Sequence, residues 1–479
     1  MLRYENILLA ILLCSIPLVT KAFDKPWAEK QKKSLEALIK KSGIPEKNLA
    51  IYVAGGEGEP IVVTAMQAEK KMTPASVTKL VTAAAVLNQF PPGSKFKTTL
   101  LSSAKVENGT LKGDLILKGG GDPSFVSETM WYLVNIFKRT GIQKIQGDIV
   151  VDDHFFDQVR FDESRQKERV DRAYDAPAGA MSFNWNSANI FVRPGDKVGG
   201  AANVFVDPEN DYIELKAKVK TVKAGGKTAI SIDRDKRGKG VGDLITVRGQ
   251  IALDSKETVA YKNVTQPDLW SGSNLKSFLK QRDIEVTGKV RSGITPSGAR
   301  LLAEAEGKLI EDVLADMDKF SNNYVAEMLA KDIAASIDPP GTLDKGMKAL
   351  NSYMTRISVP SDQYELVNPS GLTRDNKMSA FALWKVLNDM HFQFKFQPEF
   401  TKSLPIAGID GTLKNRMRGT PAERWVRAKT GFLTGVVSLA GYAGRADGTV
   451  LPFVFLFNGS ADESHVRSLF DRMATSLVE

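Results

Sequence analysis

A serine and a lysine stand three residues apart in the segment 76–79, SVTK, where a hydroxyl nucleophile and an amine base could act together. Residues three apart on a helix project from the same face, so the Lys79 amine could reach the Ser76 hydroxyl and accept its proton. Lysine is a known substitute in serine hydrolases that lack a histidine base. The chain has three histidines, none near a serine-glycine elbow or a paired ligand spacing: His154, His391 and His465.

Taken alone this spacing is weak evidence, because it also fits a helix N-terminus with a solvated lysine. Two further elements follow along the chain, an S-x-N element at Ser321 and Asn323 and a K-T-G element at Lys429, Thr430 and Gly431. In this order the three elements are the signature of penicillin-recognising serine enzymes. The structural alternatives are a helix cap at Asn323 and a strand-entry turn at Lys429.

The first residues have the pattern of a secretory signal, with Arg3, an apolar run from Ile7 to Val19, and the small residue Ala22. The run is shorter than the roughly 20 apolar residues of a membrane-spanning helix, which favours cleavage after Ala22 over a permanent anchor. Cys14 would leave with this leader, so the mature chain would have no disulfide and no cysteine-ligated metal. We therefore predict a secreted protein, located in the periplasm or associated with the cell wall outside the cell.

The formal net charge of +9 suits anionic surroundings such as a bacterial wall or lipid headgroups. It leaves open both a loose association with a membrane surface and plain basic solubility without a partner. The basic residues are scattered without interleaved aromatics, so we expect no nucleic-acid partner. No cofactor or metal site is indicated, and the run Gly119–Gly121 is predicted to be a flexible turn rather than a phosphate cradle.

Apolar periodicity and stop signals predict the elements that must position these residues. Helices are predicted at 27–41, 80–90, 309–337, 342–357, 379–390 and 463–477. Two β-branched runs, 49–53 and 60–64, flank a glycine-rich turn and predict a hairpin, and 427–457 has the texture of strands.

Between about residues 95 and 292 the texture changes to short strands with glycine and asparagine turns, which predicts β-rich insertions. Elements from both ends of the chain then form one discontinuous α+β domain around them. The predicted boundaries are a signal peptide at 1–22, a catalytic domain at 23–94 and 293–479, a β-rich insertion domain at 95–173 and 257–292, and a second nested β-rich insertion at 174–256.

At the three motifs the sequence resembles the low-molecular-mass class C penicillin-binding proteins, the D-alanyl-D-alanine carboxypeptidase/endopeptidase family. The resemblance covers most of the mature chain and includes GDL at 113–115, GGGDP at 119–123, GDI at 147–149, YDAP at 174–177, SGLTRDN at 370–376, LP at 404–405 and GTL at 411–413. The family also carries its extra domains between Lys79 and Ser321. It implies a penicillin-binding or transpeptidase-like domain, with a helical cluster and an antiparallel sheet.

The resemblance implies a division of labour around Ser76. Lys79 would take the Ser76 proton, Ser76 would attack the carbonyl of a D-Ala-D-Ala bond, and backbone N–H groups of Ser76 and Phe432 would stabilise the oxyanion. Ser321 would relay a proton to the departing amine, and Asn323 would hold Lys79 and the substrate amide. The implied enzyme hydrolyses peptidoglycan peptides and is inhibited covalently by β-lactam antibiotics.

The K-T-G element would bind the substrate. Lys429 would lower the pKa of Lys79 and attract a substrate carboxylate, to which the Thr430 hydroxyl would donate a hydrogen bond. Gly431 and Phe432 would complete this substrate-binding segment. Phe432 departs from the family, which usually has threonine or serine there, and its ring is expected to narrow the cleft.

A second departure is Asn368-Pro369, which stands where the family tends to have aspartate-glycine. Two other functions remain as alternatives. A β-lactamase would share the acylation chemistry, but no element can be assigned to activating a deacylating water. A non-catalytic wall-binding protein would keep the site only as a vestige, and the intact motif residues argue against it.

Overall fold

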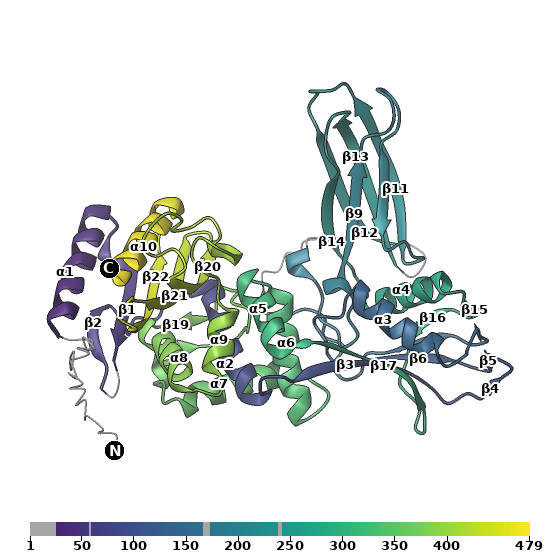
Figure 1. The fold of residues 1–479 in the computed structure, drawn as a ribbon, viewed down its shortest axis with the longest axis horizontal. Helices are drawn as coiled ribbons and strands as arrows, with labels where there is room; N and C mark the ends of the chain where they lie inside the picture. The colour runs from purple at the N-terminus through teal and green to yellow at the C-terminus, as the bar shows by residue number, and fades with distance from the viewer. Residues whose placement is uncertain (1–24, 57–58, 166–172, 238–241) are drawn as a thin grey trace, which may run out of the picture.

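The computed structural model describes residues 25–56, 59–165, 173–237 and 242–479, so the predicted signal peptide lies outside the described residues. Figure 1 shows an elongated molecule, with the elements of both chain ends in one half and the middle of the chain in the other. None of the described helices is both long and apolar enough to cross a membrane.

The first half is built on an antiparallel sheet of five strands in the order β2-β1-β22-β21-β20. These strands are β1 (Leu49–Gly55), β2 (Ile61–Met66), β20 (Val426–Leu433), β21 (Val436–Gly444) and β22 (Val450–Asn458). Alternating side chains fill a core on each face, so that Ile51 packs with α1 (Lys25–Ser42) and α10 (Glu463–Val478), and Tyr52 packs with α8 (Ala380–Phe392). The predicted hairpin and the predicted terminal helix are confirmed.

A cluster of helices covers the second face of this sheet (Figure 1). Besides α8 it comprises α2 (Lys79–Gln89), α5 (Ile310–Lys319), α6 (Asn323–Ile337), α7 (Leu343–Arg356) and α9 (Gln397–Ser403). Beside it, two antiparallel strands of two residues each form a small sheet, β18 (Tyr364–Glu365) and β19 (Lys377–Met378). The predicted α+β class, with a helical cluster and an antiparallel sheet, is confirmed.

The single helix predicted at 309–337 is wrong, because the chain breaks between α5 and α6. Asn322 caps α6 by accepting a hydrogen bond from the Val325 amide at 3.3 Å. Ser321 has a positive φ of 55°, which no helix residue adopts. The local cap therefore overrides an apolar periodicity that continues across the break.

The second half contains a mixed sheet of order β16-β8-β6-β3-β17. Its strands are β3 (Lys95–Ser102), β6 (Leu115–Gly119), β8 (Ile149–Asp152), β16 (Val290–Ser292) and β17 (Arg300–Leu309). A smaller sheet joins β4 (Val106–Glu107), β5 (Thr110–Leu111), β7 (Lys144–Ile145) and β15 (Glu285–Val286). Because β17 pairs with β3, strand pairing in this sheet extends past the boundary predicted at residue 293.

Two helices stand in this half where only strands are predicted, α3 (Ser127–Lys138) and α4 (Pro267–Gln281). Apolar periodicity does not predict α4, because the buried face of this helix includes the small and polar residues Ser271, Gly272 and Asn274. An apolar stripe of helical period is therefore weak in α4. In α3 the buried Met130, Leu133, Val134 and Phe137 do have helical spacing, with Trp131 and Tyr132 exposed, so the prediction of strands alone overlooked a helical pattern.

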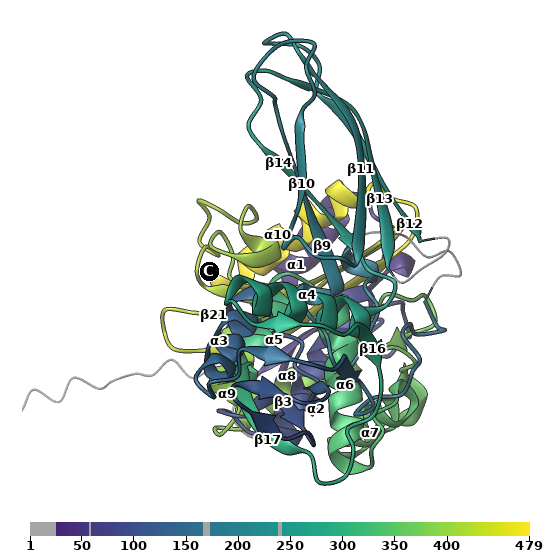
Figure 2. The ribbon, with the colours of Figure 1, turned by 90° about the vertical axis from the view of Figure 1, so that its right-hand side faces the viewer.

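Two three-stranded sheets form a finger that projects from this half (Figures 1 and 2). One sheet comprises β9 (Ser187–Arg193), β10 (Asn203–Asp207) and β14 (Thr258–Asn263), and the other β11 (Ile213–Val222), β12 (Ala229–Lys236) and β13 (Asp243–Ala252). Ile190 and Val247 pack between the sheets and belong to the same core as α3 and α4. Since β14 pairs with β9, the finger extends past residue 256, its predicted end.

The run Gly119–Gly121 packs tightly against its neighbours. A side chain on Gly120 would overlap the carbonyl oxygen of Lys97, and one on Gly121, whose φ is +85°, would overlap the carboxylate of Asp332 in α6. The prediction of a flexible turn is therefore wrong, because these glycines allow the insertion to lie directly against the catalytic half.

Candidate active site

Ser76 and Lys79 meet where a 3-10 turn (Ala75–Thr78) leads into α2. Positions three apart eclipse one another in a 3-10 turn, and the Lys79 Nζ lies 3.2 Å from the Ser76 Oγ. Ser76 is partly exposed at the surface, whereas Lys79 is fully buried beneath it. A nucleophile facing solvent above a buried amine is the geometry that lysine-assisted acyl transfer requires.

Two further oxygen atoms fix the Lys79 amine, which donates to the Asn323 Oδ1 at 2.7 Å and to the Ser370 carbonyl oxygen at 2.6 Å. Asn323 is the first residue of α6, and the helix cap is the preceding Asn322. The capping role considered for Asn323 therefore belongs to its neighbour, and the Asn323 side chain is free to point at Lys79.

Burial holds the pKa of Lys79 well below its usual value, and the positive charge of Lys429 lowers it further. The carboxylates of Asp318 and Glu327 act in the opposite direction, and the Arg165 guanidinium adds a smaller lowering effect. A neutral amine beside a serine hydroxyl can accept its proton, so the electrostatics suit a general base.

The K-T-G element lies on β20, an edge strand of the five-stranded sheet. Lys429 is fully buried, and its Nζ donates to the Ser321 Oγ at 2.9 Å and to the Thr430 carbonyl oxygen at 2.9 Å. The Thr430 hydroxyl bonds the Thr412 hydroxyl at 2.8 Å. The three motifs are therefore joined by side-chain hydrogen bonds, Lys79 to Asn323 and Lys429 to Ser321.

Gly431 of β20 lies against the segment that carries Ser76. A Cβ on Gly431 would stand 2.7 Å from the Pro74 carbonyl oxygen and 3.2 Å from the Ser76 nitrogen, so only glycine permits this approach. The Ala428 amide points outward, to the Pro405 carbonyl, and strand alternation turns the Phe432 amide to the same edge. An amide that points away from the sheet next to the Ser76 segment is the kind of donor that an oxyanion hole uses.

The Phe432 ring lies on the face of β20 opposite to the face at which Gly431 approaches Ser76. It packs under the Arg467 guanidinium of α10, which lies 4.4 Å from the ring centroid. The expected narrowing of the cleft by this ring is therefore absent on the side of Ser76.

Three residues near the lysines lie outside the predicted set. Asp318, buried at the end of α5, has its pKa raised to about 7 by burial, against the lowering effect of Lys429, whose own pKa burial lowers to about 8. Ser370 and Thr412 belong to sequence runs that carried the family resemblance. Asp318 belongs to no motif, so only its position in the fold reveals it.

The three histidines contact other parts of the molecule. His154 lies 3.2 Å from Asp152, His391 packs against Tyr442, and His465 bonds the Ser42 carbonyl.

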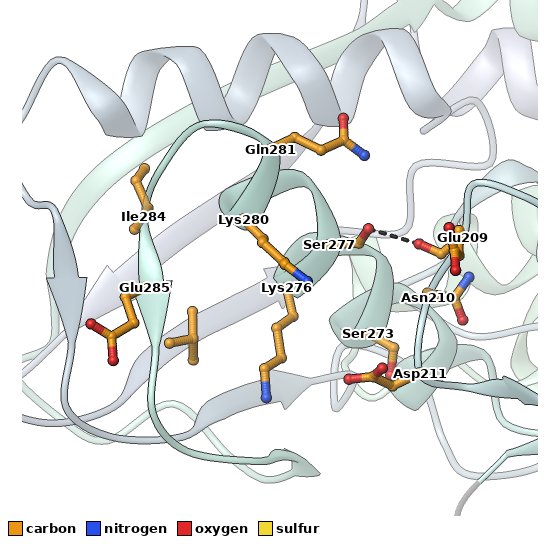
Figure 3. Close-up of a pocket in the computed structure, with 11 residues that line it drawn as sticks. Glu209, Asn210, Asp211, Ser273, Lys276, Ser277, Lys280, Gln281, Ile284 and Glu285 are labelled. Carbon is orange, nitrogen blue, oxygen red and sulfur yellow. Dashed lines mark hydrogen bonds between the residues drawn. The ribbon is translucent and has the colours of Figure 1, made fainter.

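A cavity of about 690 Å³ lies far from Lys79 and Lys429, between α4 and the base of the finger (Figure 3). Its lining includes Lys276 and Lys280 but none of the motif residues.

Comparison with known proteins gives one consistent result. The model of the D-Ala-D-Ala carboxypeptidase 3 (S13) family matches residues 31–477. A D-alanyl-D-alanine carboxypeptidase from an Actinomadura species is 30% identical over 426 residues, which cover 86% of this chain and 77% of that protein.

Solved structures agree with this match. The crystal structure of penicillin binding protein 4 from Haemophilus influenzae superposes with a TM-score of 0.76 at 25% identity, covering 92% of this chain and 98% of that one. The same protein complexed with a β-lactam gives a TM-score of 0.72 at 24% identity, with the same coverage.

Proposed function

Because this chain belongs to the D-Ala-D-Ala carboxypeptidase 3 (S13) family, we propose that it is a serine-type D-Ala-D-Ala carboxypeptidase that forms an acyl-enzyme on Ser76. The observation that carries the proposal is the fully buried Lys79 amine, 3.2 Å from the Ser76 hydroxyl. Its substrates are peptidoglycan peptides, and the cleaved bond lies on the carboxyl side of a D-alanine residue. Hydrolysis of a cross-link breaks the same kind of bond.

In the first half of the reaction, Lys79 accepts the Ser76 proton while the Ser76 oxygen attacks the carbonyl carbon of the penultimate D-alanine. The Ser76 and Phe432 amides stabilise the negative charge that develops on the carbonyl oxygen. The proton that Lys79 took from Ser76 is relayed to the leaving amine through Ser321, which is hydrogen-bonded to Lys429, so that Lys79 is neutral again. The departing D-alanine leaves an ester on Ser76.

Water then hydrolyses this ester, with Lys79 again able to accept a proton. The positive charge of Lys429 attracts the terminal carboxylate of the substrate, and the Thr430 hydroxyl can donate a hydrogen bond to it. Beyond Ala428, where β20 bonds the Pro405 carbonyl, an extended peptide could align along the β20 edge as an added strand, which would give the substrate a fixed register. A β-lactam would acylate Ser76 by the same route.

The experiment that tests this function compares wild type with Ser76→Ala. We expect wild type to release D-alanine from defined muropeptides and to retain labelled penicillin as a stoichiometric adduct. The variant should do neither while keeping the wild-type thermal unfolding temperature. Release of D-alanine by the variant would refute the serine mechanism, and rapid loss of the label from wild type would favour a β-lactamase.

We also propose that the protein is exported to the periplasm or the outer cell wall and associates loosely with anionic membrane surfaces. The leader sequence and the net charge of +9 support this. Lys218 and Arg248, both exposed, are register neighbours on β11 and β13 of the finger. Sedimentation with anionic vesicles at low salt, and release at high salt, would be the expected result.

A further inference from the structure

The side chain of Asn368 organises the turn beneath the catalytic lysine. Asn368 is fully buried, and its Oδ1 accepts hydrogen bonds from the Ser370 amide at 2.8 Å, the Ser370 hydroxyl at 2.6 Å and the Gly371 amide at 2.9 Å. Gly371 has a φ of +75°, and a side chain on it would overlap the Ala75 carbonyl oxygen. One side-chain oxygen thus fixes a turn that packs directly against the backbone of Ala75, the residue before Ser76.

This turn holds α2 at two points. The Ser370 carbonyl oxygen accepts from the Lys79 Nζ at 2.6 Å, a shorter contact than the 3.2 Å between Lys79 and Ser76. The Pro369 carbonyl oxygen accepts from the Thr82 hydroxyl at 2.7 Å. The direction of the Lys79 amine therefore depends on where the turn places the Ser370 carbonyl.

The amide nitrogen of Asn368 points the other way, toward two carboxylates. It donates to the Asp162 carboxylate, on the loop that follows β8, and to the Glu327 Oε1 of α6 at 3.4 Å. Arg165 on the same loop donates from its Nε to Glu327 at 2.6 Å and from its Nη1 to Asp175 at 2.7 Å. Asn368 thus lies between the turn that holds Lys79 and a network of charged residues from the insertion and α6.

The residue type at this position is constrained by its partners. Asp162 and Glu327 are hydrogen-bond acceptors when ionised, so the group that faces them must be a donor. The amide provides a donor on that side and an acceptor toward the turn. An ionised carboxylate at 368 would keep the three bonds to the turn but would place a third negative charge beside two others in a buried position.

We propose that Asn368 is a positioning residue for acylation, through which the Asp162 loop of the insertion holds the Ser370 carbonyl and hence the Lys79 amine in place. The inference rests on the proposed function, because it gives the insertion a part in the reaction at Ser76.

The charges around the two residues set the direction of a pH effect. Lys79 is subject to Lys429 on β20, Asp318 on α5, Glu327 on α6, and Arg165 on the loop. Asn368 faces Asp162 and Glu327, with Arg165 and Asp175 next to them. A new negative charge at 368 would favour the protonated form of Lys79, so the pH at which acylation rises would move upward.

The experiment uses the full chain in four forms, wild type, Asn368→Asp, the exchanged pair Asn368→Asp with Asp162→Asn, and the matched control Asn274→Asp. Asn274 is a buried asparagine in α4, where its side chain donates to the Trp270 carbonyl at 2.8 Å. For each we would measure the second-order rate of acylation by a fluorescent penicillin between pH 5 and 10, and the thermal unfolding temperature.

We expect Asn368→Asp to lower the acylation rate at pH 7 by about tenfold or more. The rising limb of the plot of acylation rate against pH should move upward by about one pH unit. The exchanged pair restores the original number of charges and the donor between positions 162 and 368, so it should recover most of the rate and the wild-type limb. Asn274→Asp should lower the unfolding temperature without moving the limb.

Several outcomes would overturn the inference. Acylation of Asn368→Asp at the wild-type rate throughout the pH range would do so, and so would an exchanged pair no better than the single variant. If the single variant does not fold, a folded exchanged pair with the wild-type limb supports the inference, and an unfolded one contradicts it. Failure of wild type to be acylated would instead refute the proposed function, and the inference with it.

Discussion

The candidate active site and the finger hold their charged side chains in opposite ways. In the candidate active site, Lys79 and Lys429 are fully buried and donate to hydroxyl, amide and carbonyl oxygens. In the finger, Lys216 and Arg237 both pair with the Glu214 carboxylate, each at 3.1 Å and near the surface. Burial against neutral acceptors changes what an amine can do chemically, whereas a solvated ion pair contributes little to stability.

This contrast is tested most severely by replacing Lys79 with arginine, which keeps the positive charge but cannot lose its proton at working pH. Acylation by labelled penicillin should fall by about 10²- to 10⁴-fold, the usual contribution of a general base. The matched control is Lys402→Arg, because Lys402 is a surface residue paired with Asp312 at 2.7 Å. Near-normal acylation by Lys79→Arg would exclude Lys79 as the base.

A smaller effect is expected at Lys429, whose charge acts on the substrate as well as on Lys79. Lys429→Gln keeps a hydrogen-bond donor but removes the charge, so peptides with a free terminal carboxylate should lose more in kcat/KM than uncharged thioester analogues. The expected difference is about 1–3 kcal/mol, the range for a charge-assisted hydrogen bond. Equal losses for the two substrates would reduce Lys429 to a structural role.

Removal of the buried carboxylate of Asp318 should shift the pH profile without abolishing the reaction. The negative charge of Asp318 raises the pKa of both lysines, so Asp318→Asn should lower both values. Because the neutral form of Lys79 is the base, the rising limb of acylation should move to lower pH, by less than about one unit. A limb that moves upward, or does not move, would contradict the assigned direction.

The smallest effect is expected in the finger. Glu214→Gln removes the partner of both Lys216 and Arg237, but these groups are largely hydrated, so acylation should remain at the wild-type rate at every pH. Stopped-flow measurements on this variant and on Asp318→Asn in parallel would show the contrast directly. A shifted pH profile of acylation in Glu214→Gln would mean that the finger is coupled to the candidate active site.

The sequence predicts much of the catalytic half because several of its elements have a local signal. The helix at 463–477 has a clear apolar stripe, and the hairpin of β1 and β2 has β-branched runs around a glycine turn. The motif residues are brought together as their order predicts, with Lys79 against Asn323 and Lys429 against Ser321. Their roles in the reaction remain predictions until the variants are measured.

Other features depend on tertiary contacts that have no local signal. Asp318 lies three residues before Ser321 but is not part of the S-x-N element, and the packing of α5 against α9 buries it beside two lysines. The Gly119–Gly121 run carries no information about the Asp332 carboxylate that lies against it. The α4 helix buries polar residues that periodicity assigns to the surface, because the insertion supplies their hydrogen-bond partners.

The pairing of β1 with β22 also sets the order in which the protein can fold. Residues 49–55 contact residues 450–458, so the catalytic sheet cannot close until nearly the whole chain is available. The insertion lies between them and has its own core, so it can condense first. The K-T-G strand arrives with the last part of the chain, and Ser76 therefore acquires its reactivity only at the end of folding. A chain truncated before β22 should thus keep a folded insertion but should not react with penicillin.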